Sequence, residues 1–197
     1  FLKLVPNNST ALAKKGFYEN ELKRPLLALG YFEKALAISP DFEWARIHKI
    51  RILFDTNKIK KAENELKLFL NNNPDSEWAL IELSKLKIDQ KKFSKAEIII
   101  KNIILKHGES LLSLEKLGQV YKLQKKWTKA EKIFQKLTIL NPNKSLIFTN
   151  LAFVQWKLNK IEIARLNVKK ALYVNTNSVS ARNLHFILQP EKKQRLW

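Results

Sequence analysis

The 197-residue sequence has no cysteine and no methionine, and it has only four glycines and three histidines. The absence of cysteine excludes disulfides, thiolate catalysis and every cysteine-based metal site. Four scattered glycines exclude a glycine-rich phosphate-binding loop, and three histidines far apart along the chain leave little for an imidazole site. No apolar stretch approaches the roughly 20 residues that a membrane-spanning helix needs. We therefore expect no catalytic site, no metal, no cofactor and no transmembrane segment in this chain.

Acidic residues are also scarce, since 18 of them face 37 lysines and arginines, and the net charge is +19. The excess is uneven, with a net charge of +5 in residues 1–99 and +14 in residues 100–197. The abundance of lysine, asparagine and isoleucine is typical of AT-rich coding sequence, which weakens the charge as evidence for an anionic partner. A basic surface can contact RNA or an anionic membrane. RNA binding is an alternative that we do not favour, because no base-reading motif accompanies the lysines.

An alanine recurs every 34 residues, and such internal periodicity indicates a stack of similar structural units. Around each alanine, apolar residues follow one another at spacings of three and four, which predicts an amphipathic helix. A second helical pattern precedes it across a short turn, where asparagine or lysine stands in place of glycine. Proline follows several of the second helices because it cannot continue them. The alanines are Ala28, Ala62, Ala96, Ala130 and Ala164, the turn residues are Asn57, Lys91, Lys125 and Asn159, and the prolines are Pro40, Pro74 and Pro142.

The fourth repeat is the clearest copy, with Leu-x2-Leu-Gly-x2-Tyr at residues 114–121, Ala-x3-Phe at residues 130–134 and Pro142. This pattern resembles the tetratricopeptide repeat, in which a tryptophan stands in place of Leu114. The resemblance implies an all-α fold, a right-handed superhelical α-solenoid of antiparallel helix pairs. It also implies a concave groove, lined by the first helix of each pair, that binds peptides or partner proteins.

The period divides the chain into five repeats, at residues 9–42, 43–76, 77–110, 111–144 and 145–178. Residues 1–8 are expected to end a truncated preceding repeat, and residues 191–197 to form a tail or linker. Residues 179–190 are expected to cap the array or begin a sixth repeat, with Ala181, Leu184 and either Ile187 or Leu188 covering the fifth. The lack of methionine agrees with a fragment of a longer array.

A small residue of each first helix is expected to face the alanine of the second, because a larger side chain would hold the helices apart. Gly118 takes this place in the fourth repeat, and Gly16, Ser84 and Ala152 take it in three others. Ile50 is the exception, and it predicts a splayed or repacked second repeat.

Mapped by phase, the first helices present ten candidate partner-binding residues to the groove: Phe17, Trp44, His48, Arg51, Trp78, Lys85, Gln119, Asn150, Phe153 and Trp156. Their aromatic and cationic side chains suit an acidic or aromatic peptide. For each pair an alternative to the groove stays open. Trp44 and Trp78 could instead pack between repeats, and Arg51 and Lys85 could instead belong to a solvated face.

Other charged residues are expected on solvated surfaces. The pairs Glu63/Lys67 and Glu131/Gln135 have the spacing of exposed helical interactions. The lysines between residues 122 and 136 are expected on the convex surface, although phase also places Lys122 in the groove. Trp127 falls in the turn phase, which indicates a structural role.

We therefore interpret the chain as a non-catalytic scaffold that binds a protein or peptide, and no small-molecule substrate, in the groove. One alternative is a recruitment arm of a larger enzyme, such as an O-linked sugar transferase that carries these repeats. The clamp by which some family members bind acidic chaperone tails has no match here in any register. The compartment stays open, with a cytoplasmic location slightly favoured.

Overall fold

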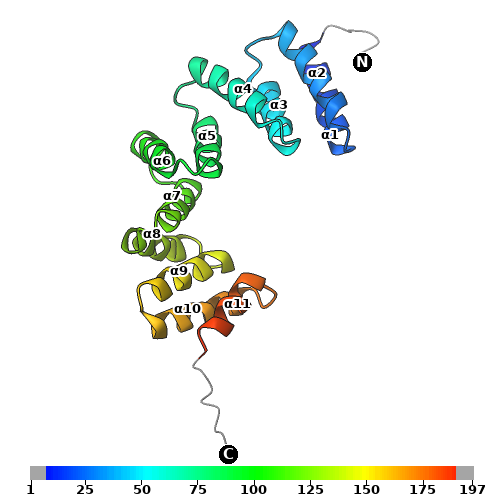
Figure 1. Ribbon diagram of the computed structural model, residues 1–197. Coiled ribbons are helices and arrows are strands. Elements are labelled where there is room, and N and C mark those ends of the chain that lie inside the picture. Colours follow the sequence, from blue (N-terminus) through cyan, green and yellow to red (C-terminus); the bar gives the residue numbers. More distant parts are fainter. Residues whose placement is uncertain (1–7, 190–197) are drawn as a thin grey trace, which may run out of the picture. The chain divides into compact units, whose positions relative to one another are not determined.

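The computed structural model describes residues 8–189, and all the regular structure within that range is helical (Figure 1). The helices are α1 (Ser9–Glu21), α2 (Pro25–Ile38), α3 (Glu43–Asp55), α4 (Ile59–Asn72), α5 (Glu77–Asp89), α6 (Phe93–His107), α7 (Leu111–Leu123), α8 (Trp127–Leu140), α9 (Ser145–Lys157), α10 (Ile161–Val174) and α11 (Val179–Ile187). The chain divides into two compact units, which we call unit 1 (residues 1–79) and unit 2 (residues 80–197). The expected all-α class is confirmed.

The same turn joins the two helices of every pair. Its central residue has a positive φ of 57 to 61°, at Lys23, Asn57, Lys91, Lys125 and Asn159. The next N–H then bonds back to the end of the first helix, as from Lys126 N to Tyr121 O at 2.9 Å, which is a Schellman arrangement. Asparagine tolerates this left-handed conformation better than lysine does. The three lysine turns therefore carry more backbone strain than the two asparagine turns.

We predict that Lys125→Gly raises the free energy of unfolding by up to about 1 kcal/mol, because glycine adopts positive φ without steric opposition. The matched control is Lys132→Gly, which removes an exposed lysine from the interior of α8. That variant should lower the free energy of unfolding by roughly 1 kcal/mol. Urea denaturation measures both, and a loss of stability in Lys125→Gly equal to that of the control would contradict the strain.

The two helices of a pair approach closely where small residues meet. All five second-helix alanines are completely buried. A Cβ added to Gly118 would lie 3.0 Å from Cζ of Phe134, and one added to Gly16 would lie 3.1 Å from the carbonyl oxygen of Ala28. Ser84 and Ala152 are also fully buried, and so is the larger Ile50, whose helix α3 approaches α4 less closely than α1 approaches α2.

At the ends of the helices, α2, α4 and α8 each end two residues before their proline. Ala181, Leu184 and Leu188 of the last segment are buried against α9 and α10, whereas Ile187 is 53% exposed. Asn8, expected within the preceding repeat, instead caps α1 and accepts a 2.7 Å hydrogen bond from the N–H of Ala11. The expectations for residues 1–7 and 190–197 lie outside the described residues.

Two buried carboxylates tie successive repeats of unit 2 together. Glu97 of α6 accepts from Lys126 Nζ at 2.8 Å, and Glu131 of α8 accepts from Lys160 Nζ at 2.7 Å. Both members of the tie repeat after 34 residues, so the same ion pair forms twice. The expectation that Glu131 lies on a solvated face is wrong, because the lysine of the next repeat closes over it. The exposed pair Glu63–Lys67 forms as expected, at 3.3 Å.

The ionisation of Glu97 is set by its partners. Burial by itself would raise the pKa, but hydrogen bonds from Lys101, Lys126 and Gln124 outweigh it and lower the pKa to about 2. The unfolded chain therefore binds the proton more tightly than the folded chain does. The stabilisation is complete above about pH 4.5 and is lost as the pH falls toward 2.

We predict that Glu97→Gln removes this part of the acid sensitivity. The free energy of unfolding falls in both proteins as the pH is lowered from 4.5 to 2. The fall should be smaller in the variant, by on the order of 2 kcal/mol, because glutamine does not titrate. Urea unfolding at a series of pH values measures the slope. Glu162→Gln, at a carboxyl that is 80% exposed, is the control for the loss of one negative charge. If unfolding free energy depends on pH in Glu97→Gln as steeply as in the wild type, the ion pair does not form.

Candidate functional site

The first helices α7 and α9 of unit 2 line a hollow of about 260 Å³. Its lining residues are Glu115, Lys116, Gln119, Lys122, Phe134, Lys144, Leu146, Ile147 and Asn150. The hollow brings together two of the ten predicted groove residues, Gln119 and Asn150. It also contains Lys122, which therefore belongs to the groove and not to the convex surface. Lys122 lies in the last turn of α7 and so follows the phase of the first helix.

Two half-buried lysines of the hollow lack a carboxylate partner. Lys122 Nζ donates to Asn150 Oδ1 at 2.7 Å and lies 5.7 Å from the ring centroid of Phe153. Burial lowers the pKa of Lys122. The pKa of Lys116 is lowered by burial first and by the charge of Lys85 second, while nearby carboxylates oppose both. Within residues 8–189, neither Lys116 nor Lys122 forms an ion pair.

Two of the three carboxylates whose charges act on Lys116 are already paired with other lysines, and the third is Asp89 of α5. Glu115 accepts from Lys144 Nζ at 2.6 Å, and Glu82 accepts from Lys85 Nζ at 2.6 Å. The hollow thus keeps two ammonium groups that are partly removed from water and form no ion pair, although the charges of Glu115, Glu82 and Asp89 act on Lys116. An incoming carboxylate would form charge-assisted hydrogen bonds with them, which are the stronger kind.

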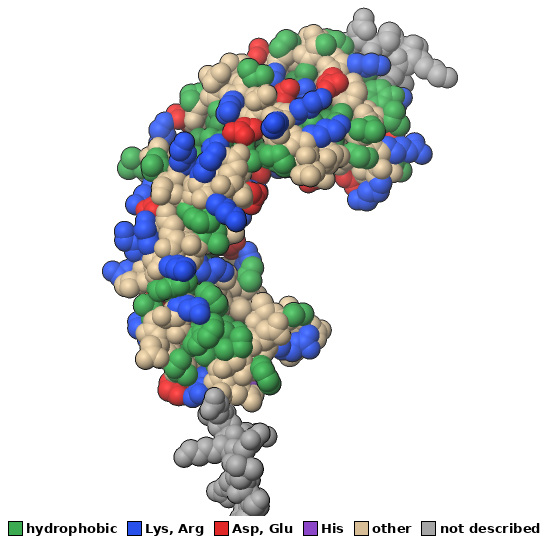
Figure 2. Space-filling view, viewed as in Figure 1, with side chains coloured by type: hydrophobic (Ala, Val, Ile, Leu, Met, Phe, Trp, Pro, Cys, Tyr) green, Lys and Arg blue, Asp and Glu red, His purple; other side chains and the backbone are tan. Residues whose placement is uncertain are grey.

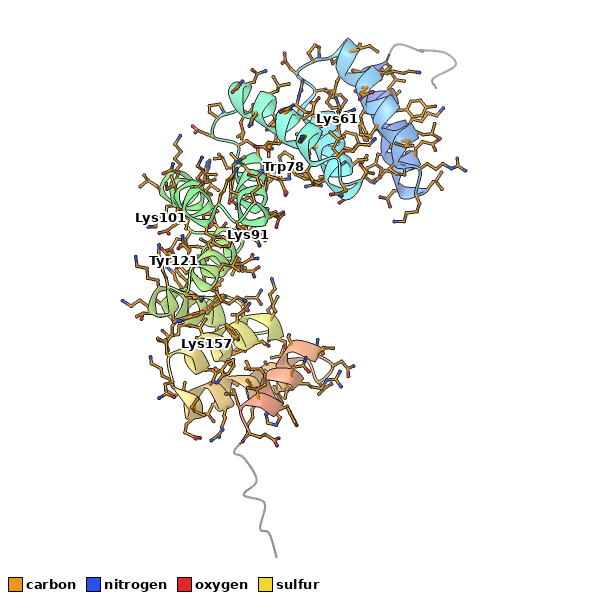
Figure 3. All side chains as sticks on the ribbon, in the orientation of Figure 1. Lys61, Trp78, Lys91, Lys101, Tyr121 and Lys157 are labelled. Carbon is orange, nitrogen blue, oxygen red and sulfur yellow. The ribbon has the colours of Figure 1, made fainter. Side chains whose placement is uncertain are left out.

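An aromatic and cationic cluster lies at the end of α9, outside the residues that line the hollow. The rings of Phe153 and Trp156 are 5.8 Å apart, and Lys157 Nζ lies 3.8 Å from the Trp156 ring centroid (Figure 3). Trp127 packs against Phe153 at 6.1 Å, which agrees with a structural role for that tryptophan. Phe153 and Trp156 are each half-buried, so each keeps one part of its surface available.

In unit 1 the predicted residues Phe17, Trp44 and His48 form one aromatic cluster. The ring centroids of Trp44 and His48 are 4.3 Å apart, and Phe17 lies 5.3 Å from His48. Trp44 is nevertheless 38% exposed, so it both packs between α1 and α3 and faces solvent. Burial first, and Arg51 second, lower the pKa of His48, which favours the neutral imidazole at pH 7.

Arg51 and Trp78 meet in the same unit, where the guanidinium carbon lies 5.6 Å from the tryptophan ring centroid. Trp78, labelled in Figure 3, is half-buried and packs edge-on against Phe69 at 5.9 Å. Its Nε1 is buried with no hydrogen-bond partner. The ring therefore serves packing within unit 1, and the exposed Arg51 covers it.

The position within the 34-residue repeat predicted Gln119 and Asn150. It could not predict Lys144, because that residue lies in the loop before α9. Phe134 and Ile147 were also outside the predicted set, since they belong to the core below the hollow. Among residues 8–189, no group of three or more histidine, aspartate or glutamate side chains is placed to hold a metal ion.

Comparison with known proteins agrees with this architecture. Residues 21–79 match the family model of the tetratricopeptide repeat. The fold is similar to that of pilF from Pseudomonas aeruginosa, with 20% identity, a TM-score of 0.78, and coverage of 91% of this chain and 82% of that one. YrrB, described as a tetratricopeptide repeat protein with an unusual peptide-binding site, gives 13% identity, a TM-score of 0.72, and coverage of 92% and 94%.

A tetratricopeptide repeat protein from Parabacteroides merdae is 17% identical, with a TM-score of 0.71 and coverage of 95% of this chain and 88% of that one. No curated protein sequence matches the chain. The resemblance to the family is thus confirmed: the chain has the tetratricopeptide repeat fold, and its residues 21–79 carry the sequence pattern of that family.

Proposed function

We propose that the chain is a non-catalytic scaffold that binds a peptide segment of a partner protein on the surface formed by its first helices. The observation that carries this proposal is the hollow between α7 and α9, where neither Lys116 nor Lys122 forms an ion pair within residues 8–189. An acidic side chain or a terminal carboxylate of the partner would complete their hydrogen bonding.

The surroundings of the hollow support a peptide as the ligand. Leu146 lines it and is well exposed, so an apolar side chain of the partner has a surface to cover. Gln119 and Asn150 offer amide groups that can pair with a peptide backbone. The fully buried helix contacts below the hollow form it in advance, which lowers the entropy lost on binding.

The comparison with known proteins also agrees with peptide binding, and it gives no evidence for a second binding site. YrrB, which shares the fold, is described as having a peptide-binding site. The same function would serve a recruitment arm of a larger enzyme, since the arm and the independent scaffold differ only in what is joined to this chain.

We predict that a displayed library of random dodecapeptides, selected on the whole chain, yields sequences rich in aspartate or glutamate. For a selected peptide, Lys116→Ala with Lys122→Ala should weaken binding at least about 10-fold, because a half-buried charge pair is lost. Fluorescence anisotropy of the labelled peptide measures the affinity.

The matched control is Lys132→Ala with Lys169→Ala, which removes the same charge from exposed positions of α8 and α10. This control should bind as the wild type does, apart from a small change due to net charge. Equal weakening in the two double variants would reduce the effect to net charge and would refute the hollow as the site. A library without acidic enrichment would refute the proposed ligand chemistry.

A further inference from the structure

Unit 2 carries a periodic row of exposed apolar side chains on its second helices. Leu105 of α6, Ile139 of α8 and Tyr173 of α10 are separated by 34 residues, and they are 84%, 81% and 92% exposed. Single exposed leucines are ordinary on protein surfaces. Three large apolar side chains at one phase of three consecutive repeats are different, because they lie on the same face of equivalent helices and mark an interaction surface.

Lysines stand beside this row on the same helices. Residues three, four and seven positions apart share one face of a helix, so the row extends to a larger surface that we call the outer face. Its exposed members are Ile98, Lys101, Asn102 and Leu105 on α6, Lys132, Gln135, Lys136 and Ile139 on α8, and Leu166, Lys169, Lys170 and Tyr173 on α10. Figure 2 shows that lysine and arginine side chains are numerous on the visible surface of unit 2, with hydrophobic side chains among them. Lys101 of this face is labelled in Figure 3.

Carboxylates contribute little to the outer face. Glu97 and Glu131 belong to α6 and α8 and are buried in the ties between repeats, although Glu97 also pairs with Lys101 of the outer face at 2.8 Å. Glu162 stands at the start of α10 and pairs with Arg165, and Glu109 follows α6 and pairs with Lys136. Five lysines accompany the apolar side chains. Lys101 and Lys136 are paired with Glu97 and Glu109, and within residues 8–189 Lys132, Lys169 and Lys170 form no ion pair, so the face is both positive and apolar.

We propose that the outer face binds the surface of an anionic lipid bilayer. The side chains of Leu105, Ile139 and Tyr173 would enter the boundary between headgroups and acyl chains, where exposed apolar area is removed from water. The lysines reach outward on long aliphatic stems and place their ammonium groups at the level of the lipid phosphates. No described helix is long and apolar enough to cross a bilayer, so the contact is peripheral.

The chemistry of the face favours lipid over RNA. Of the three side chains in the row only Tyr173 offers a ring on which a base can stack, because Leu105 and Ile139 are aliphatic. The outer face has no arginine, and RNA recognition relies on aromatic stacking and guanidinium contacts. Lipid attraction needs only positive charge and apolar area together, which this face supplies.

The row is confined to unit 2, and this provides an internal control. At the same phase unit 1 has Ala37 and Asn71. Unit 1 nevertheless exposes three leucines of its own second helices, at Leu26, Leu27 and Leu68. Substituting these leucines removes a similar apolar area without touching the outer face.

The test is flotation of the whole chain with vesicles of phosphatidylcholine, alone or with about one third phosphatidylserine. The wild type should float with the anionic vesicles and not with the neutral ones. The triple variant Leu105→Ser, Ile139→Ser, Tyr173→Ser keeps the net charge, and its partition coefficient should fall at least about 10-fold. The control Leu26→Ser, Leu27→Ser, Leu68→Ser should float as the wild type does. Circular dichroism shows whether each variant keeps its helices.

A second variant tests the charges. Lys132→Glu, Lys169→Glu, Lys170→Glu should abolish flotation with anionic vesicles, because repulsion replaces attraction. Three results would overturn the proposal: the wild type does not float with anionic vesicles, it floats equally with neutral vesicles, or the serine variant floats as well as the wild type. Binding of a labelled oligouridylate that depends on the three lysines but not on the apolar row, without flotation, would assign the face to RNA instead.

Discussion

The close contact between the two helices of each repeat is the constraint on which the other features depend. In the fourth repeat, Phe134 occupies the space that a side chain on Gly118 would fill. The same phenylalanine lines the hollow between α7 and α9. A larger residue at position 118 would displace Phe134 by steric overlap and would change the floor of the candidate site. Packing inside the repeat therefore determines the shape of the surface outside it.

The ties between repeats decide where the charges of unit 2 are exposed. Glu97 and Glu131 are buried against lysines of the following repeat, and on the outer face Glu97 pairs only with Lys101 of its own helix. Against a well-packed apolar pair such buried ion pairs have little net advantage, but once the glutamate is buried its ionised form is stabilised by the lysines. They also set the position of the next repeat, since Lys126 and Lys160 each reach one glutamate of the repeat before. The remaining lysines then dominate both surfaces of unit 2.

The two proposed surfaces use lysine in different ways. In the hollow, Lys116 and Lys122 are half-buried, so their charges act in a medium that screens them less than water does. On the outer face, Lys169 and Lys170 are exposed and keep their hydration. The first arrangement suits a few directed hydrogen bonds to one carboxylate. The second suits many weak contacts with a charged layer.

Local steric patterns made much of the fold predictable. The 34-residue period located the helix pairs and four of the five left-handed turn residues, and Lys23 follows from the same phase. Phase also led to Gln119 and Asn150, because residues at one position of a repeat face one direction. The inward turn of Glu131 could not be read in this way, since its partner Lys160 lies 29 residues away in the next repeat. The partial exposure of Trp44 depends equally on its neighbours, Phe17 and His48.

The central claim is that a peptide carboxylate binds between α7 and α9. The most direct measurement is an NMR titration of the isotope-labelled chain with a selected acidic peptide, following the backbone and side-chain amides. The account predicts that the largest shifts occur at Lys116, Gln119 and Asn150, with the side-chain amide of Asn150 changing as Lys122 turns to the ligand. Shifts confined to the aromatic cluster of unit 1 or to the outer face would contradict it.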